Sequence, residues 1–167
     1  MDNNKTSSWK RDLHFNNEDI KNDRIIDATI NIIKEHIESH NLTRDNNILT
    51  IISELLNNEI DHSILAINSN LKEKANGFSL YKEERSKRLA EITAQYIDIS
   101  TSIRNTGDDT TLTIFLKSSG TTSYPNIEDI AIKPHKPYGR GLFLIKELCE
   151  TFSIDKDNRI ISLVYKW

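Results

Sequence analysis

The stretch from Ile48 to Ile60 restricts the fold of this chain more than any other part of the sequence. Seven of its thirteen residues are isoleucine or leucine, so a helix there is apolar around most of its circumference. Neighbouring layers have to bury it. We therefore predict a central helix that begins after Thr43 or Asp45 and runs to about Ile67. With 37% hydrophobic residues among 167, the chain can build one such core.

The apolar spacing changes from helical to alternating near residue 95. Helical spacing predicts further helices over residues 23–39, 78–92 and 139–149. Alternation predicts strands over residues 9–15, 96–103 and 111–117, and a closing hairpin over residues 152–165. Strands that group as hairpins, with the helices kept apart from them, indicate an α+β two-layer sandwich.

The composition excludes several classes of protein. Lys and Arg number 22 and Asp and Glu 25, so the net charge of −3 lacks the basic excess that a nucleic-acid binder needs. No apolar run is long enough to span a membrane. Residues 1–8 are polar, without a signal-peptide core, so we expect a flexible tail and a cytoplasmic protein. The single cysteine, Cys149, excludes an intramolecular disulfide.

Three polar motifs interrupt this pattern. Glu54, Asn58 and His62 are spaced four residues apart, which places them within roughly 80° of one another on a helix. A carboxylate and a carboxamide side by side can activate a hydroxyl and hold Mg²⁺ against phosphates. The alternative is a solvated stripe on a mostly buried helix.

The other two motifs are rich in glycine. In the segment 139–143, Gly-Arg-Gly-Leu-Phe, glycines just before a helix let the backbone approach phosphate oxygens at the positive end of the helix dipole. A tight turn into a helix is the alternative. The segment 117–122, Lys-Ser-Ser-Gly-Thr-Thr, ends a strand and opens the segment 118–138, which contains all three prolines. A loop of that length is typical of a functional lid or of a disordered segment, and we expect it to be mobile without ligand.

In this order, the motifs resemble those of the GHKL ATPase superfamily, in particular the bacterial anti-sigma-factor serine kinases. Glu54-Leu55-x-x-Asn58-x-x-x-His62 is similar to the family's asparagine box, and Gly139-Arg-Gly-Leu-Phe-Leu-Ile to its second glycine box. The resemblance covers nearly the whole chain. It implies one domain over residues 9–167 with the GHKL (Bergerat) fold, helices on a mixed, mainly antiparallel sheet. Residues 70–92 resemble a helical insertion of one subgroup.

The resemblance also implies a role for each motif. ATP and Mg²⁺ would lie between the asparagine-box helix and the lid. Glu54 would be the catalytic base that accepts the proton of a target serine, and Asn58 the Mg²⁺ ligand. The implied nucleotide-binding residues are Asn58, His62, Ser118, Gly120, Gly139, Arg140, Gly141, Leu142 and Phe143.

The first glycine box departs from the family pattern, Asp-x-Gly-x-Gly, whose aspartate binds the adenine amino group. Here Ser118 and Thr122 stand at the aspartate and second glycine positions. Losing such a contact costs on the order of 1.5–3 kcal/mol, about ten- to hundredfold in affinity. We therefore expect weak ATP binding that Ser118→Asp tightens. Glu59 follows Asn58 where the family has a small residue, and its charge opposes ATP unless it points away.

Two functions follow as expectations. The first is an ATP-dependent serine-protein kinase, weakened in nucleotide binding, that binds and phosphorylates a small anti-sigma antagonist protein. The second is a catalytically impaired pseudo-kinase that acts as a partner-switching, protein-binding module in signal transduction. The expected partner is the antagonist or a sigma factor, with neither nucleic acid nor membrane, and a homodimer stays open.

Overall fold

The computed structural model describes residues 7–40, 42, 45–130 and 140–167. Its main elements are β1 (Ser7–Phe15), α1 (Asn17–Lys21), α2 (Ile25–Ser39), α3 (Asn46–Asn58), α4 (Gly77–Glu91), β2 (Ile97–Asn105), β3 (Thr110–Ser118), α5 (Gly141–Leu148), β4 (Thr151–Asp155) and β5 (Ile160–Lys166). Three short helical turns complete them: η1 (Glu59–Ile64), η2 (Ser69–Glu73) and η3 (Ile127–Asp129). The predicted α+β class is confirmed.

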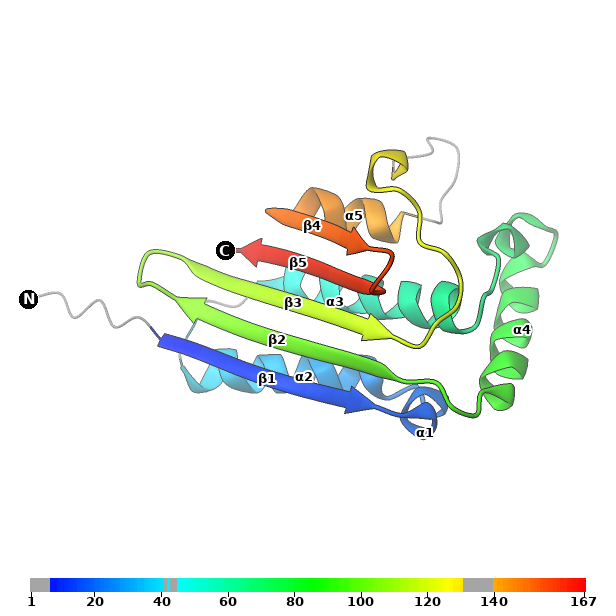
Figure 1. Ribbon diagram of the computed structural model, residues 1–167, viewed down its shortest axis with the longest axis horizontal. Coiled ribbons are helices and arrows are strands. Elements are labelled where there is room, and N and C mark those ends of the chain that lie inside the picture. The colour runs from blue at the N-terminus through cyan, green and yellow to red at the C-terminus, as the bar shows by residue number, and fades with distance from the viewer. Residues whose placement is uncertain (1–6, 41, 43–44, 131–139) are drawn as a thin grey trace, which may run out of the picture.

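The five strands form one sheet in the order β1-β2-β3-β5-β4 (Figure 1). Every pairing among the described strands is antiparallel, so the expectation of a mixed sheet is wrong in that respect. The first strand also begins earlier than predicted. Ser7 and Ser8 pair with Asn105 and Arg104, so these two residues belong to the sheet and not to a flexible tail.

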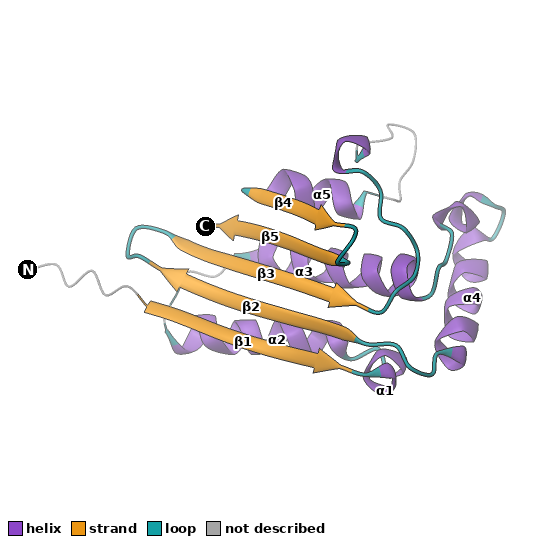
Figure 2. Cartoon of the chain, viewed as in Figure 1, coloured by secondary structure: helices purple, strands orange, loops and turns teal. Residues whose placement is uncertain are grey.

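Among the residues that the structure describes, the helices lie on one face of the sheet and none covers the other face (Figures 1 and 2). Figures 1 and 2 show α2, α3 and α5 behind the strands, with α4 across one end of the sheet. The inward positions of β2 alternate as predicted, because Ile97, Ile99, Thr101 and Ile103 are all buried. No helix in the described part of the chain combines the length and the apolar character that crossing a membrane requires.

The predicted central helix is α3, which lies between α2 and α5 (Figure 1). Asp45 caps it by accepting a hydrogen bond from the backbone N–H of Asn47 at 2.8 Å. Thr43, the other predicted cap, lies outside the described residues. Ile51, Ile52 and their neighbours Leu55 and Leu56 are at most 2% exposed, which confirms that this helix is buried on most sides.

The helix does not continue as an α-helix to Ile67. It passes at Glu59 into η1, a π-helical turn with a wider spacing of residues. Four of the six residues in η1 are buried, and three of those are polar: Glu59, Asp61 and Ser63. Buried polar groups need hydrogen-bond partners, so each of these side chains is expected to be hydrogen-bonded to another part of the protein.

The opposite end of the helical layer contains an aromatic stack. The ring of Trp9, on β1, lies 4.6 Å from that of His36, on α2, and the His36 ring lies 4.1 Å from that of His40. His36 is 8% exposed. Burial, and then the nearby His40, hold the pKa of His36 below its usual value.

Candidate functional site

The asparagine-box residues and the second glycine segment meet where α3 ends and α5 begins. A β-carbon built on Gly141 would collide with Oε2 of Glu54 and Nδ2 of Asn58. Only glycine therefore allows the two helices to approach this closely without moving those side chains. Two motifs that lie far apart in the sequence are thus brought into contact.

A polar hollow of about 260 Å³ opens at this junction. Five of the predicted site residues line it: Glu54, Asn58, His62, Arg140 and Gly141. The other lining residues are Asn57, Asp61, Ser69, Lys72, Tyr81 and Leu144. We call this the polar hollow. It combines two carboxylates with two cationic side chains, a set that suits a phosphate–metal ligand.

Two side chains in the polar hollow are oriented by backbone hydrogen bonds. Nδ2 of Asn58 donates to the carbonyl oxygen of Glu54 at 2.7 Å, which leaves Oδ1 as an acceptor for a cation. Nδ1 of His62 lies 2.7 Å from the carbonyl oxygen of Ile67 and has to donate to it. Nε2 is then the ring nitrogen left for a ligand. Within the described residues, no group of three His, Cys, Asp or Glu could hold a metal by itself, so a bound Mg²⁺ would need ligand oxygens as well.

Sequence reasoning missed the contribution of η2 and α4 to this hollow. Asp61 is 8% exposed and accepts hydrogen bonds from Tyr81 at 2.8 Å and from Nε of Arg85 at 2.7 Å. Arg85 also donates to both oxygens of Asp23, at 3.1 and 2.9 Å. The ammonium of Lys72 lies 3.9 Å from the centre of the Tyr81 ring. The helical insertion is therefore fastened to the site. The sequence carries two signals for it: the polar pair Asp61-His62 within an apolar helix, and Tyr81 and Arg85 at helical spacing in the insertion.

Glu59 does not point into the polar hollow. Its carboxylate is 1% exposed and accepts hydrogen bonds from the hydroxyls of Ser118 and Tyr124. We call Glu59, Ser118 and Tyr124 the carboxylate cluster. Because the charge is directed to the end of β3, it lies away from the Glu54–Gly141 junction. The sequence predicts that the Glu59 charge opposes ATP unless it points away from Asn58, and it does point away.

The described part of the lid is fastened to η1 and to the last hairpin. Gly120 lies so close to Ser63 that a β-carbon would collide with the Ser63 hydroxyl and lie 2.7 Å from its backbone. The guanidinium of Arg159 donates to the Ser63 hydroxyl at 2.6 Å and to the carbonyl oxygen of Thr122 at 3.1 Å. It also lies 4.8 Å from the centre of the Tyr124 ring. Burial, and then the Glu59 carboxylate, raise the pKa of Tyr124, so its hydroxyl remains a donor.

The remaining predicted site residues fall in different places. Ser118 and Gly120 lie at the carboxylate cluster and not in the polar hollow. Leu142 lines a second, small hollow of about 60 Å³ beside Glu59 and Tyr124. Phe143 is half-buried and lines neither hollow. Gly139 lies outside the described residues.

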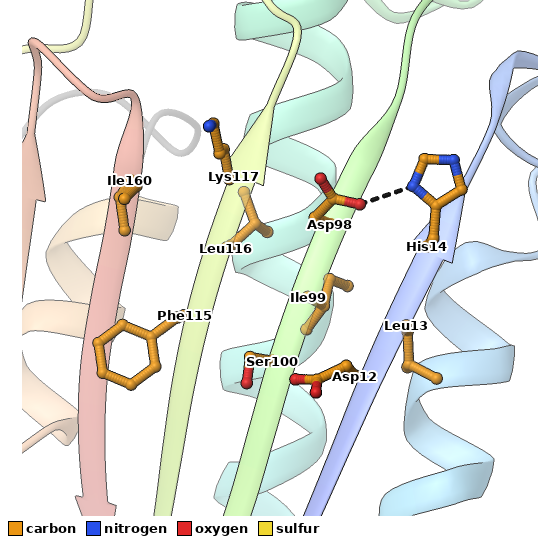
Figure 3. Close-up of a pocket in the computed structure, with 10 residues that line it drawn as sticks. All are labelled: Asp12, Leu13, His14, Asp98, Ile99, Ser100, Phe115, Leu116, Lys117 and Ile160. Carbon is orange, nitrogen blue, oxygen red and sulfur yellow. Dashed lines mark hydrogen bonds and ion pairs between the residues drawn. The ribbon is translucent and has the colours of Figure 1, made fainter.

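A broader hollow of about 550 Å³ lies on the open face of the sheet (Figure 3). Its most evident polar pair is His14 and Asp98, whose Nδ1 and Oδ1 atoms are 2.6 Å apart. These side chains are 64% and 47% exposed, and Phe115 nearby is 50% exposed. Groups that remain in water and contact each other are poorly placed to bind a small ligand. The junction of α3 and α5 is therefore the better candidate site.

In comparisons with known proteins, no family model matches the chain and no curated protein is significantly similar to it, so the candidate site is defined by its geometry.

Proposed function

We propose that the chain is an ATP-binding regulatory domain of the GHKL superfamily, of the anti-sigma-factor serine-kinase type, working in the cytoplasm. In this proposal it binds a small anti-sigma antagonist protein and phosphorylates one of its serines. The observation that carries the proposal is the contact of Gly141 with both Glu54 and Asn58. Two segments that resemble nucleotide-binding motifs separately lie against each other across one polar hollow.

The residues of the polar hollow suit the phosphate end of such a ligand. The start of α5 and the side chains of Lys72 and Arg140 provide positive charge for phosphate oxygens. Asn58 would hold Mg²⁺ through its amide oxygen. ATP would supply the phosphoryl group. Glu54 would accept the proton of the attacking serine hydroxyl, and the protein would act mainly by positioning and by electrostatic stabilisation.

A second function is favoured by the carboxylate cluster. Glu59, Ser118 and Tyr124 contact one another at the other side of Asn58, where the resemblance would place the base of the nucleotide. A site whose base end is filled by its own side chains fits a pseudo-kinase that grips its protein partner without ATP. The two functions share the fold and differ in whether the base end can open.

The test measures nucleotide binding and phosphoryl transfer in parallel. Calorimetry with ATP and Mg²⁺ on the wild-type chain and on Asn58→Ala reports binding at the polar hollow. Incorporation of labelled phosphate into a candidate antagonist protein reports transfer, with Glu54→Gln as the matched variant. Transfer that depends on Glu54 supports the kinase. Tight ATP-independent binding of an antagonist, without any transfer, supports the pseudo-kinase. If the protein binds neither ATP nor an antagonist, both proposed functions are wrong.

A further inference from the structure

One acceptor position of the buried Glu59 carboxylate is filled by a donor from the segment that follows β3. The Ser118 hydroxyl donates to Oε1, while its own oxygen accepts from the backbone N–H of Gly120 at 3.1 Å. The Tyr124 hydroxyl lies 2.9 Å from Oε1 and 3.0 Å from Oε2. Among the described residues, Tyr124 is therefore the donor that satisfies Oε2. A carboxylate can accept about four hydrogen bonds, and one left bare in the interior is strongly destabilising.

Tyr124 is held from a segment that is otherwise exposed. Its neighbours Ser123 and Pro125 are exposed, as are Thr121 and Thr122 before them. Its ring lies under the guanidinium of Arg159 and its hydroxyl on Glu59. A flat ring that carries a hydrogen-bond donor thus sits between a cation and a buried carboxylate. A nucleobase with an exocyclic amino group is likewise a flat ring system that carries a hydrogen-bond donor at its edge.

The carboxylate cluster is connected to the polar hollow. Asn58 and His62 line both the polar hollow and the small hollow that contains Glu59 and Tyr124. The small hollow holds only about 60 Å³, too little for a base while Tyr124 stays in place. A ligand with phosphates in the polar hollow would extend past Asn58 towards Glu59. Its base can enter only by replacing the Tyr124 ring.

We propose that Glu59 is the base-specificity residue of the site and that Tyr124 is a removable plug that occupies its place in the ligand-free protein. This inference rests on the proposed function. An adenine displaces Tyr124, donates its amino group to Oε2 of Glu59 and stacks under Arg159. The carboxylate that the first glycine box lacks at Ser118 is supplied from the opposite side of the site by Glu59. Guanine presents a carbonyl oxygen in place of that amino group, and two acceptors would then face each other.

The experiment compares three ligands by calorimetry in the presence of Mg²⁺: ATP, GTP and tripolyphosphate, which has no base. Tyr124→Ala opens the base end, and Tyr124→Phe removes only the hydroxyl. We expect ATP to bind at least tenfold more tightly to Tyr124→Ala than to the wild type, and about threefold more tightly to Tyr124→Phe. Tripolyphosphate should bind all of these proteins equally, because it does not reach the plug.

Glu59→Gln tests the specificity directly. Glutamine keeps the size of glutamate and one acceptor oxygen for Ser118 and Tyr124, while its amide group can donate to a carbonyl. The preference for ATP over GTP should fall from at least tenfold to near unity. Tyr165→Phe is the matched control, since it removes a tyrosine–carboxylate hydrogen bond of 2.5 Å to Asp45 at the start of α3. It should leave all three affinities unchanged.

The outcomes separate the plug from the nucleotide site itself. If ATP and tripolyphosphate bind but neither Tyr124 variant changes the ATP affinity, the plug is wrong and the proposed nucleotide site stands. The same holds if Tyr165→Phe tightens ATP as much as Tyr124→Phe does, because the effect is then a general loosening. If no protein binds ATP or tripolyphosphate, the proposed nucleotide site fails and this inference fails with it.

Discussion

The hydroxyl of Ser118 donates a hydrogen bond to the buried carboxylate of Glu59, and so joins the end of β3 to the first residue of η1 across 59 positions of sequence. Each residue departs from the motif that its surroundings resemble. Together they place a single negative charge between two elements. The effect of a substitution at Ser118 therefore depends on the Glu59 carboxylate, and the effect of one at Glu59 depends on the Ser118 hydroxyl.

This relationship adds a stability cost to Ser118→Asp, the substitution that the sequence predicts to tighten ATP binding. A second carboxylate beside Glu59 would be buried next to a like charge, and one of the pair would be forced to stay protonated. We expect the free energy of unfolding to fall by about 2–4 kcal/mol at pH 7. Urea unfolding at pH 7 and pH 5 checks this, because protonation should reduce the loss at pH 5. Adding Glu59→Ser to Ser118→Asp leaves one carboxylate and should recover most of the stability. A stable single variant would contradict the bond.

Glu54 and Asn58 should separate chemistry from binding. Glu54→Gln keeps the size and hydrogen bonding of the side chain but removes the proton acceptor, so phosphoryl transfer should slow by roughly 10²–10⁴-fold with ATP affinity nearly unchanged. Asn58→Ala should instead weaken binding of ATP with Mg²⁺. Transfer rates and calorimetric affinities, measured on the same preparations, decide the matter. Equal transfer by Glu54→Gln and wild type would show that another group is the base.

Substitution of Gly141 should mainly affect ATP binding, whereas substitution of Gly120 should mainly affect stability. In Gly141→Ala the new methyl group meets the mobile ends of Glu54 and Asn58, which can turn aside, so the melting temperature should hardly change while the affinity for ATP falls at least tenfold. In Gly120→Ala the methyl group meets the backbone of Ser63, which cannot turn aside. That variant should lose about 1–3 kcal/mol of stability. Thermal unfolding and ATP titration of both variants test the contrast, and a large stability loss in Gly141→Ala would refute it.

Arg85 should contribute strongly to folding stability, mainly through its ion pair with the nearly buried Asp61. Its side chain is 18% exposed and that of Asp61 12%, so Arg85→Met leaves a nearly buried charge with Tyr81 as its remaining described donor. We expect a loss of about 2–3 kcal/mol and faster amide exchange in α4. Asp23→Asn is the control, because Asp23 is 53% exposed and its ion pair contributes less than about 1 kcal/mol. Equal losses in the two variants would argue against the anchoring role of Asp61.

His36 should make stability depend on pH. Its folded pKa is lowered, so the unfolded chain binds a proton first as the pH falls. Stability should be full above the unfolded value of about 6.5 and should decline as the pH falls below it towards the folded pKa. His36→Phe keeps a ring against Trp9 and should flatten this part of the profile. Urea midpoints between pH 5 and 8 measure it. A decline of equal size in His36→Phe would assign the effect to other groups.

Much of the fold follows from local patterns. The density of apolar residues in α3 reflects burial on many sides. The alternation in β2 reflects burial on one side. Both patterns can be recognised in a single sequence. The direction of strand pairing beyond a hairpin leaves no such trace, so nothing local in the sequence corrects the mixed sheet that the family resemblance implies; the described pairings are all antiparallel. The turn η1 was also out of reach, because Ile60 keeps an apolar position that an α-helix would equally well use.

The candidate site divides in the same way. Glu54, Asn58 and Gly141 are visible as motifs, and the structure brings them into contact. Ser118 and Glu59 are visible only as two separate departures, since nothing local in a sequence shows that the end of a strand will meet a residue on a distant helix. Asp61, Lys72 and Tyr81 were missed for a related reason: the polar residues of an insertion read as a solvated surface until their contacts with a distant element, here η1, are known.

The bond from Arg159 to the hydroxyl of Ser63 spans 96 residues, so it has a consequence for biosynthesis. Contacts between distant residues form late, because the intervening chain has to be ordered first. While the ribosome is still extending β3, η1 is already made but Arg159 is not, and Glu59 and Ser63 lack their later partners. The same C-terminal hairpin adds Ile161, Leu163 and Tyr165 to the apolar core, so the core and the Tyr124 end of the site both stay incomplete until it is made. The hydrogen bonds around Ser63 are therefore completed only after the chain up to Arg159, at the turn between β4 and β5, has been made.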